Sequence, residues 1–228
     1  MSRHEPDVAR HWARTFFGSP TNEVVVRGRF ITFEGIDGSG KTTIARRVAA
    51  ILRRSGHRVL LTREPTDSWL GKTVKRSYDD DVGPLAETFL FLADRAHHTA
   101  DILKWLEDGA IVVADRYQDS TFAYQGARLE GVVHDPLLWL RAVSAPAIVA
   151  PDLTILLDIP PALGLRRIAS RRRKVRFETE AFLARVVANY NRLARSRRFV
   201  RIDGSGSVED VTREAVTLIS RRLGLRLR

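Results

Sequence analysis

The stretch FITFEGIDGSGKTTIARRVA, residues 30–49, decides the fold of this chain. It begins with an apolar run typical of a β-strand, continues through a glycine-rich turn and ends in a basic pattern with helical spacing. Residues 35–42 match Gly-x-x-x-x-Gly-Lys-Ser/Thr, a spacing in which backbone N–H groups converge on phosphate oxygens at the positive end of a helix. The stretch therefore predicts a loop that binds the phosphates of a nucleoside triphosphate.

Individual residues of this loop carry separate expectations. Lys41 should reach the outer phosphates, and Thr42 should place its hydroxyl on Mg²⁺. Asp37 is unexpected, because a carboxylate that faced the triphosphate would weaken its binding, so we expect it to point toward a second substrate instead. The expected ATP-binding residues of the loop are Gly35, Ile36, Asp37, Gly38, Ser39, Gly40, Lys41, Thr42 and Thr43.

Further apolar runs follow the loop at intervals that fit a parallel sheet. They lie at 57–62, 110–115, 153–158 and 198–203. Runs that are apolar in the middle are typical of strands buried on both faces, and the segments between them are long enough for crossover helices. The pattern predicts an α/β fold with three layers, in which helices flank a parallel five-stranded sheet.

Length and composition fit one soluble domain with anionic ligands. The chain has 228 residues, 44% of them apolar, which suffices for one substantial core. A break signal, GSPTN, separates residues 1–28 from the motifs, so we predict an N-terminal extension of unassigned role and a domain spanning 29–228. The net charge of +11 favours nucleotides or nucleic acid as partners.

Several classes of protein are excluded by what the sequence lacks. Without cysteine it has no disulfide, no thiolate nucleophile and no cysteine-ligated zinc. No apolar run approaches the roughly 18 residues of a membrane helix, and the first residues lack the apolar core of a signal peptide. We therefore expect a cytoplasmic protein that does not associate with membranes.

Three polar stretches point to a kinase with an acceptor site. The chain has no Asn-Lys dipeptide and so lacks the Asn-Lys-x-Asp signature of guanine-specific switches. The stretches TREPTD (62–67) and DRYQDSTFAYQG (115–126) follow predicted strands, and FLFLADR (89–95) lies in a predicted helix over 84–109. Because ligands bind beyond the carboxyl ends of parallel strands, we expect these groups to converge.

These stretches resemble the thymidylate kinase family. The resemblance is carried by the loop and polar stretches above, by ADRAHH (93–98), PDLTILLD (151–158) and RFETEAF (176–182), and by RIDGS (201–205). It covers about residue 29 to the end of the chain. It implies a P-loop NTPase fold, transfer of the γ-phosphoryl group of ATP to dTMP with Mg²⁺ in dTTP synthesis, and a homodimer.

The resemblance also assigns the acceptor residues. In the family, arginines that match Arg63 and Arg116 hold the acceptor monophosphate, and residues that match Phe91 and Arg95 stack on and hydrogen-bond the thymine. The acidic residue that matches Asp37 accepts a hydrogen bond from the sugar 3′-hydroxyl, and a tyrosine crowds the 2′ position. The residues expected to contact dTMP are Asp37, Arg63, Pro65, Phe91, Arg95, Arg116, Ser120, Tyr124 and Gln125.

Simpler roles stay open for several of these side chains. Phe91 can be a core residue, Arg95 a partner in an ion pair and Tyr124 a packing residue. Asp115 ends a buried strand, where a lone carboxylate is costly, so it should either hold Mg²⁺ through water, orient Arg116, or form a structural ion pair. His97 is followed directly by another histidine, and adjacent helix positions point in different directions, so we assign the pair no metal site.

The arginine-rich stretch RRIASRRRKVR (166–176) matches the lid of the family, which we place at about 166–178. Arg171 is the best candidate for a catalytic lid arginine, followed by Arg167 and Arg176. Family members with glycine at the position of Gly38 supply arginines from the lid. Val175 departs from the acidic residue usual before this Arg-Phe-Glu motif.

The expected sites can now be stated as a set. The catalytic residues are Lys41, Asp115, Arg116 and Arg171, and Thr42 and Asp115 are the metal residues. Outside the loop, the residues expected near ATP are Arg167, Arg176, Asp203, Gly204 and Ser205. Two alternatives remain open: a kinase of another nucleotide or nucleoside, and a nucleic-acid-binding ATPase that uses the basic stretch.

Overall fold

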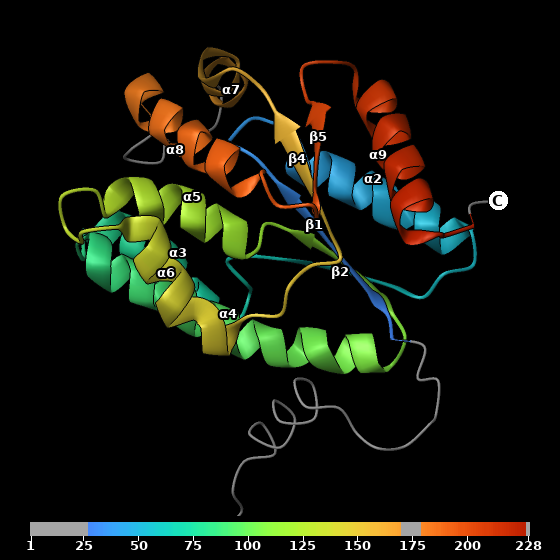
Figure 1. Ribbon diagram of the computed structural model, residues 1–228, viewed down its shortest axis with the longest axis horizontal. Helices are drawn as coiled ribbons and strands as arrows, with labels where there is room; N and C mark the ends of the chain where they lie inside the picture. Colours follow the sequence, from blue (N-terminus) through green and yellow to red (C-terminus); the bar gives the residue numbers. More distant parts are fainter. Residues whose placement is uncertain (1–26, 170–178, 227–228) are drawn as a thin grey trace, which may run out of the picture.

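The computed structural model describes residues 27–169 and 179–226, which form a parallel sheet flanked by helices (Figure 1). The strands are β1 (Arg29–Glu34), β2 (Val59–Arg63), β3 (Ile111–Asp115), β4 (Leu153–Asp158) and β5 (Phe199–Asp203). Their order in the sheet is β2-β3-β1-β4-β5, and every pairing is parallel. The predicted α/β fold with a five-stranded parallel sheet is confirmed.

The register brings the ends of the strands together. Phe33 of β1 lies opposite Asp115 of β3, which in turn lies opposite Arg63 of β2. The segments that follow these three positions therefore leave the same edge of the sheet side by side. Since the phosphate loop follows β1 directly, this edge carries the candidate site.

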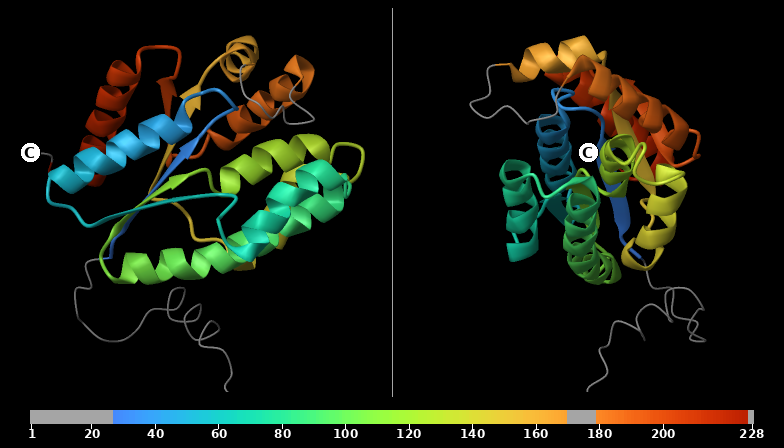
Figure 2. Two further views of the ribbon diagram at one scale, coloured as in Figure 1. Left: turned by 180° about the vertical axis from the view of Figure 1, so that it is seen from behind. Right: turned by 90° about the vertical axis from the view of Figure 1, so that its left-hand side faces the viewer.

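Helices cover both faces of the sheet (Figures 1 and 2). They are α2 (Lys41–Arg54), α3 (Trp69–Asp80), α4 (Pro84–Glu107), α5 (Gln118–Arg128), α6 (Pro136–Ser144), α7 (Pro161–Ile168), α8 (Glu180–Leu193) and α9 (Val208–Leu223). A short 3-10 turn, Ala145–Ala147, follows α6. The helix predicted over 84–109 is α4, which begins at its proline and ends just before Gly109, a residue with a left-handed φ of 73°.

Alternation along β1 sorts the core into two sides. Ile31 and Phe33 pack with residues of α2 and α9, whereas Phe30 points to the opposite face and packs with α4. A further cluster on that second face joins α5, α6 and α8. By the same alternation Glu34, the last residue of β1, lies on the side of α5 and α8.

None of the helices within the described ranges is both long and apolar enough to cross a membrane. The cytoplasmic location stays a prediction from the sequence. The boundary at 28 and 29 also stays a prediction. Arg171 and Arg176 lie outside the described residues, as does most of the expected lid.

Candidate active site

The phosphate loop encloses a small cavity where β1 meets α2. Its volume is about 140 Å³, and it is lined by Asp37, Gly38, Gly40, Lys41, Thr42, Thr43 and Arg116. Gly38 and Gly40 have φ values of 83° and 94°, a left-handed conformation that residues with a Cβ rarely adopt. The loop can therefore turn its N–H groups toward one point, as phosphate binding requires.

Lys41 lies buried at the base of this cavity. Its Nζ donates to the backbone carbonyl of Ile36 at 2.7 Å and to Ser39 Oγ at 3.4 Å. Burial lowers the pKa of the Lys41 ammonium to about 7, and the positive charge of Arg116 adds to the shift. The negative charge of a triphosphate in the cavity would stabilise this ammonium and raise its pKa.

Thr42 and Asp115 meet beside Lys41 and fit a magnesium site. Thr42 Oγ1 donates to Asp115 Oδ2 at 2.5 Å. Asp115 Oδ1 is buried and has no hydrogen-bond partner among residues 27–169 and 179–226. Hydroxyl and carboxylate oxygens are the ligands that Mg²⁺ takes in nucleotide sites, so this donor set suits the ion predicted from the sequence.

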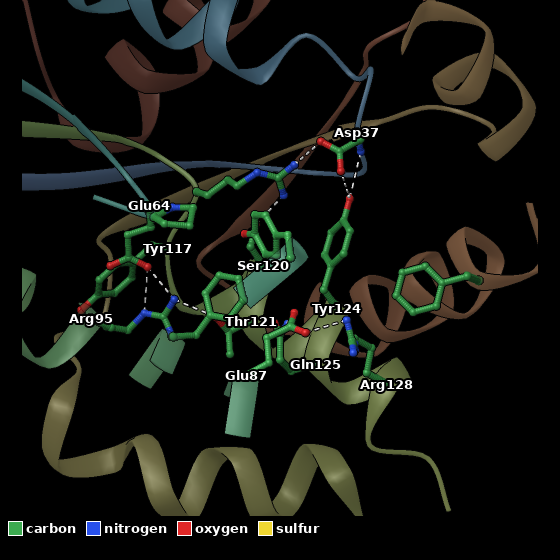
Figure 3. Close-up of a pocket in the computed structure, with 15 residues that line it drawn as sticks. Asp37, Glu64, Glu87, Arg95, Tyr117, Ser120, Thr121, Tyr124, Gln125 and Arg128 are labelled. Carbon is green, nitrogen blue, oxygen red and sulfur yellow. Dashed lines mark hydrogen bonds and ion pairs between the residues drawn. The ribbon is translucent and has the colours of Figure 1, made fainter. Parts of the chain in front are cut away.

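A second cavity, of about 210 Å³, lies next to the phosphate loop (Figure 3). Of the residues expected to contact dTMP, all but Arg63 line it: Asp37, Pro65, Phe91, Arg95, Arg116, Ser120, Tyr124 and Gln125. They come from the phosphate loop, from the segment that follows β2, from α4, from the turn between β3 and α5, and from α5 itself. The convergence of the three polar stretches, expected from their positions beyond the strands, is confirmed for this cavity.

Arg63 lies elsewhere. Its Nη2 donates to both carboxylate oxygens of Asp67, at 2.7 and 2.9 Å, and its side chain is half exposed. It lines a neighbouring cavity of about 530 Å³, which Thr42 and Asp115 also line. Arg63 therefore lies on the side of Thr42 and Asp115, and its expected contact with the acceptor phosphate stays a prediction.

Asp37 and Arg116 line both the phosphate-loop cavity and the second cavity. Arg116 Nη2 donates to Asp37 Oδ1 at 2.6 Å, and the Tyr124 hydroxyl donates to Asp37 Oδ2 at 3.2 Å. Burial alone would lower the pKa of the Arg116 guanidinium, but the charge of Asp37 raises it well above its ordinary value. As Figure 3 shows, Asp37 points toward Tyr124 of the second cavity, the direction expected from the sequence.

Arg95 is the most deeply buried cation of the second cavity. Its Nε and Nη2 donate to Glu64 Oε2, at 3.0 and 2.5 Å, and Nη2 also donates to Thr121 Oγ1. Burial would raise the pKa of Glu64, but the charge of Arg95 and the hydrogen bond from His98 lower it. Arg95 Nη1 is buried without a partner in the described part of the chain and is free to donate to a ligand.

Sequence reasoning missed three acidic residues of the site. Glu64, inside the quoted TREP motif, holds both Arg95 and His98. Glu87 lines the second cavity and pairs with Arg128 at 2.6 Å. Glu34, the residue before the phosphate loop, is fully buried and accepts from the hydroxyl of Ser120, which lines the second cavity. A buried carboxylate in a motif needs a cation or donors nearby, and that requirement was the available signal.

Arg167 is the one lid candidate among the described residues. Its guanidinium donates to the carbonyl oxygens of Gly38, Gly204 and Ser205, at 3.3, 2.8 and 3.1 Å. It thereby joins the phosphate loop to the loop after β5, two segments expected to border ATP. Asp203 Oδ1 accepts a hydrogen bond from the backbone N–H of Ser205 at 2.8 Å.

Gly38 has no room for a side chain. A Cβ built there would lie 2.4 Å from the carbonyl oxygen of Gly164 in α7, closer than such contacts occur. An arginine at this position would require α7 to move. This steric limit fits the expectation that any catalytic arginine comes from the lid rather than from the loop.

Comparison with known proteins bears on this geometry. Residues 33–215 match the family model described as thymidylate kinase. The chain belongs to the thymidylate kinase family. A probable thymidylate kinase of Natronomonas pharaonis is 45% identical in an alignment of 199 positions that covers 84% of this chain and 99% of the relative. A thymidylate kinase of Nitratidesulfovibrio vulgaris is 43% identical in an alignment of 213 positions that covers 86% of this chain and 93% of the relative.

The residues that match the thymidylate kinase family include the elements that carry the candidate site. The matched segment begins at Phe33, includes the phosphate loop and reaches α9. A third relative, a probable thymidylate kinase of Methanosarcina acetivorans, is 42% identical in an alignment of 198 positions that covers 85% of this chain and 96% of the relative. The resemblance read from the motifs is confirmed.

Proposed function

We propose that this thymidylate kinase family member transfers the γ-phosphoryl group of ATP to dTMP, giving dTDP and ADP. One observation carries the proposal: Asp37 and Arg116 line both the phosphate-loop cavity and the second cavity. Two nucleotides bound in these cavities would meet at this pair of residues. Such a geometry suits an in-line transfer between two phosphates and is of no use to an enzyme that only hydrolyses ATP.

The acceptor nucleotide would be oriented by charges and rings in the second cavity. Arg116 offers its guanidinium to the acceptor phosphate, since arginine forks suit phosphate oxygens. Phe91 lies beside Tyr78 with ring centroids 6.3 Å apart, a partly exposed aromatic surface on which a base can stack. The Nη1 of Arg95, which no group of the described residues accepts from, supplies a donor for a base carbonyl.

The donor nucleotide would lie on the phosphate loop. Lys41 binds the outer phosphates, where charge shifts during the transfer, and gives up its hydrogen bond to the Ile36 carbonyl to do so. Thr42 and Asp115 would hold Mg²⁺, which neutralises phosphate charge when bound. Arg167 holds the loop after β5 against the phosphate loop, so both segments keep their positions around ATP.

Acceptor preference is the direct test of the proposed function. We expect ADP formation from ATP and Mg²⁺ to be fastest with dTMP among nucleoside monophosphates. Arg95→Ala should lower kcat/KM for dTMP by roughly 10–100-fold, the cost of a hydrogen bond from a charged donor. The measurement is a coupled ADP assay with each monophosphate in turn.

Two checks accompany this assay. Arg95→Ala leaves Glu64 buried without its cation, so melting curves must show that the variant is folded. The double variant Arg95→Gln/Glu64→Gln removes the charged donor without leaving a buried ion and should show the same loss. Equal rates of ADP formation with all monophosphates would contradict the assignment of dTMP as acceptor. The absence of ADP formation with every monophosphate would contradict it as well.

We also propose that two copies of the chain associate, as the family resemblance implies. Leu85 and Phe89 of α4 and Leu138 of α6 are exposed apolar residues, and the Phe89 ring contacts Trp139 at 5.9 Å. Together they form an apolar face across two helices of the kind that dimers cover.

Light scattering should give twice the 25.7 kDa of one chain. Phe89→Glu places a charge on the apolar face and should give monomers. Val208→Glu, the control on the exposed surface of α9, should leave the dimer intact. A monomeric native protein would refute the proposal.

A further inference from the structure

Arginines gather at the amino edge of the sheet, opposite the candidate active site. Helices that join parallel strands run back against them, so α2, α8 and α9 all end at this edge. Segments 51–58, 192–198 and 215–226, which contain these helix ends, hold 10 arginines and no aspartate or glutamate. In the whole chain Lys and Arg exceed Asp and Glu only by 38 to 27, so the positive charge is concentrated here.

Hydrogen bonds join the three segments. Arg222 Nη2, at the end of α9, donates to the backbone carbonyl of Arg197 in the turn before β5 at 2.5 Å. His57 Nε2, in the turn after α2, lies 2.9 Å from the backbone carbonyl oxygen of Arg226. Figures 1 and 2 show the ends of α2 and α9 side by side. The arginines therefore belong to one continuous surface.

Six exposed arginines of these segments form what we call the basic edge: Arg54, Arg195, Arg197, Arg221, Arg222 and Arg226. None of them forms an ion pair with a carboxylate of residues 27–169 or 179–226. By contrast Arg76, Arg185 and Arg213, which are exposed elsewhere, each pair with a carboxylate within 3.2 Å. The charge of the basic edge is therefore not compensated by the described part of the chain.

The helix dipole explains only part of this pattern. A cation in the last turn of a helix stabilises the helix, and Arg54 and Arg221 occupy such positions. Arg195 and Arg197 lie beyond the end of α8, and Arg226 lies beyond the end of α9. Like charges gathered on one surface repel each other and lower the stability of the fold. A bound anion would remove this repulsion.

The surroundings of the basic edge favour a nucleic acid as that anion. Guanidinium groups match phosphate oxygens, and a duplex presents phosphates at close, regular spacing. Protein partners and membrane surfaces are held by apolar contacts as well. Within the described ranges, the three segments expose no large apolar side chain. A cationic surface without apolar contacts suits a phosphate backbone, which is bound through charge.

We propose that the basic edge binds the phosphate backbone of duplex nucleic acid without sequence preference. The phosphate loop lies at the opposite edge of the sheet, so a duplex and the two nucleotides can be bound together. The inference does not rest on the proposed function, because binding a duplex requires no phosphoryl transfer. It also differs from the nucleic-acid-binding ATPase considered from the sequence, since it uses the basic edge instead of residues 166–176 and predicts no ATP hydrolysis stimulated by DNA.

Fluorescence anisotropy with a labelled DNA duplex of about 20 base pairs tests the proposal. At 50 mM NaCl the native protein should bind with a Kd of roughly 10⁻⁶ M, near the tight end of the range for non-specific complexes. If about four phosphates are contacted, the affinity should fall roughly 100-fold at 200 mM NaCl. An RNA duplex of equal length should bind within tenfold as tightly, and binding of only one duplex would identify that nucleic acid as the partner.

Removing the charge of the basic edge should abolish this binding. The quadruple variant Arg54→Ser/Arg195→Ser/Arg197→Ser/Arg221→Ser removes side chains that have no hydrogen-bond partner among residues 27–169 and 179–226, so the fold should be kept. Its affinity for the duplex at 50 mM NaCl should be at least roughly 30-fold lower, and the affinity that is left should depend less on salt, because fewer phosphates are neutralised.

A matched control removes four positive charges from other surfaces. The quadruple variant Lys72→Ser/Arg76→Ser/Arg185→Ser/Arg213→Ser changes exposed positions of α3, α8 and α9. Its affinity for the duplex should stay within about threefold of the native value, because it leaves the basic edge intact. Melting temperature and kinase kinetics with dTMP should be unchanged in both quadruple variants.

Several results would overturn the inference. An equal loss of affinity in both quadruple variants would assign the binding to net charge, and native affinity in the variant of the basic edge would assign it to another surface. No duplex binding at 50 mM NaCl, or binding to phosphatidylserine vesicles without binding to a duplex, would also refute it. A native protein that binds the duplex but phosphorylates no monophosphate would refute the proposed function alone.

Discussion

Replacing Arg116 with alanine is expected to lower kcat/KM for dTMP by about 10³-fold, the lower end of the range for arginines that stabilise a transferring phosphoryl group. Arg116 lines both the phosphate-loop cavity and the second cavity and is the cation paired with Asp37. Without it, the acceptor phosphate would approach the carboxylate of Asp37 with no guanidinium between them. Steady-state kinetics with dTMP varied at saturating ATP would measure the loss.

Two further variants make this prediction specific. Arg116→Lys keeps the charge but loses the fork that reaches Asp37 and Ser120 together, so it should recover only a small part of the lost activity. Arg58→Ala removes an exposed arginine at the opposite, amino end of β2, where it pairs with Asp108. It should leave kcat/KM unchanged. Activity of Arg116→Ala within tenfold of the native value would refute the role.

The fold was predictable because its signals are local. Each strand shows as an apolar run, and each crossover shows as a segment of sufficient length. The phosphate loop can be recognised because left-handed glycines and a lysine occur at fixed spacing. Helix ends were also local: Ser207 caps α9 by accepting from the N–H of Asp210 at 3.1 Å.

Side-chain partners were less predictable, because a motif does not show which of several nearby groups a side chain binds and because other partners come from distant elements. Arg63 turns to Asp67, four residues on, and the motif alone does not show this choice. The sequence leaves Asp115 three possible roles. Its bond to Thr42, together with an Oδ1 that has no hydrogen-bond partner within the described ranges, favours the metal role. The hydrogen bond from the Tyr190 hydroxyl to Glu34 joins α8 to β1 across a separation of 156 residues, which no spacing rule covers.

Lys41 is the second residue whose loss should be severe. Lys41→Met is expected to lower kcat by about 10²–10³-fold, the usual cost of removing a group that stabilises charge in the transition state. Methionine fills a similar volume, so the buried site should stay packed. Single-turnover rates at saturating ATP would separate this loss from weaker binding. A kcat within threefold of the native value would contradict it.

The lowered pKa of Lys41 adds a signature that steric disturbance cannot imitate. The ammonium titrates near pH 7 in the free protein, and bound phosphates raise its pKa, so ATP binding takes up a proton above that pH. ATP affinity should therefore fall as pH rises from 7.5 to 9, by up to roughly tenfold per pH unit. In Lys41→Met the affinity should be lower and independent of pH over this range, because no ammonium is left to titrate. If ATP affinity changed equally with pH in the native protein and in Lys41→Met, another group would be responsible for the pH dependence. The charge of Lys41 would then not explain ATP binding.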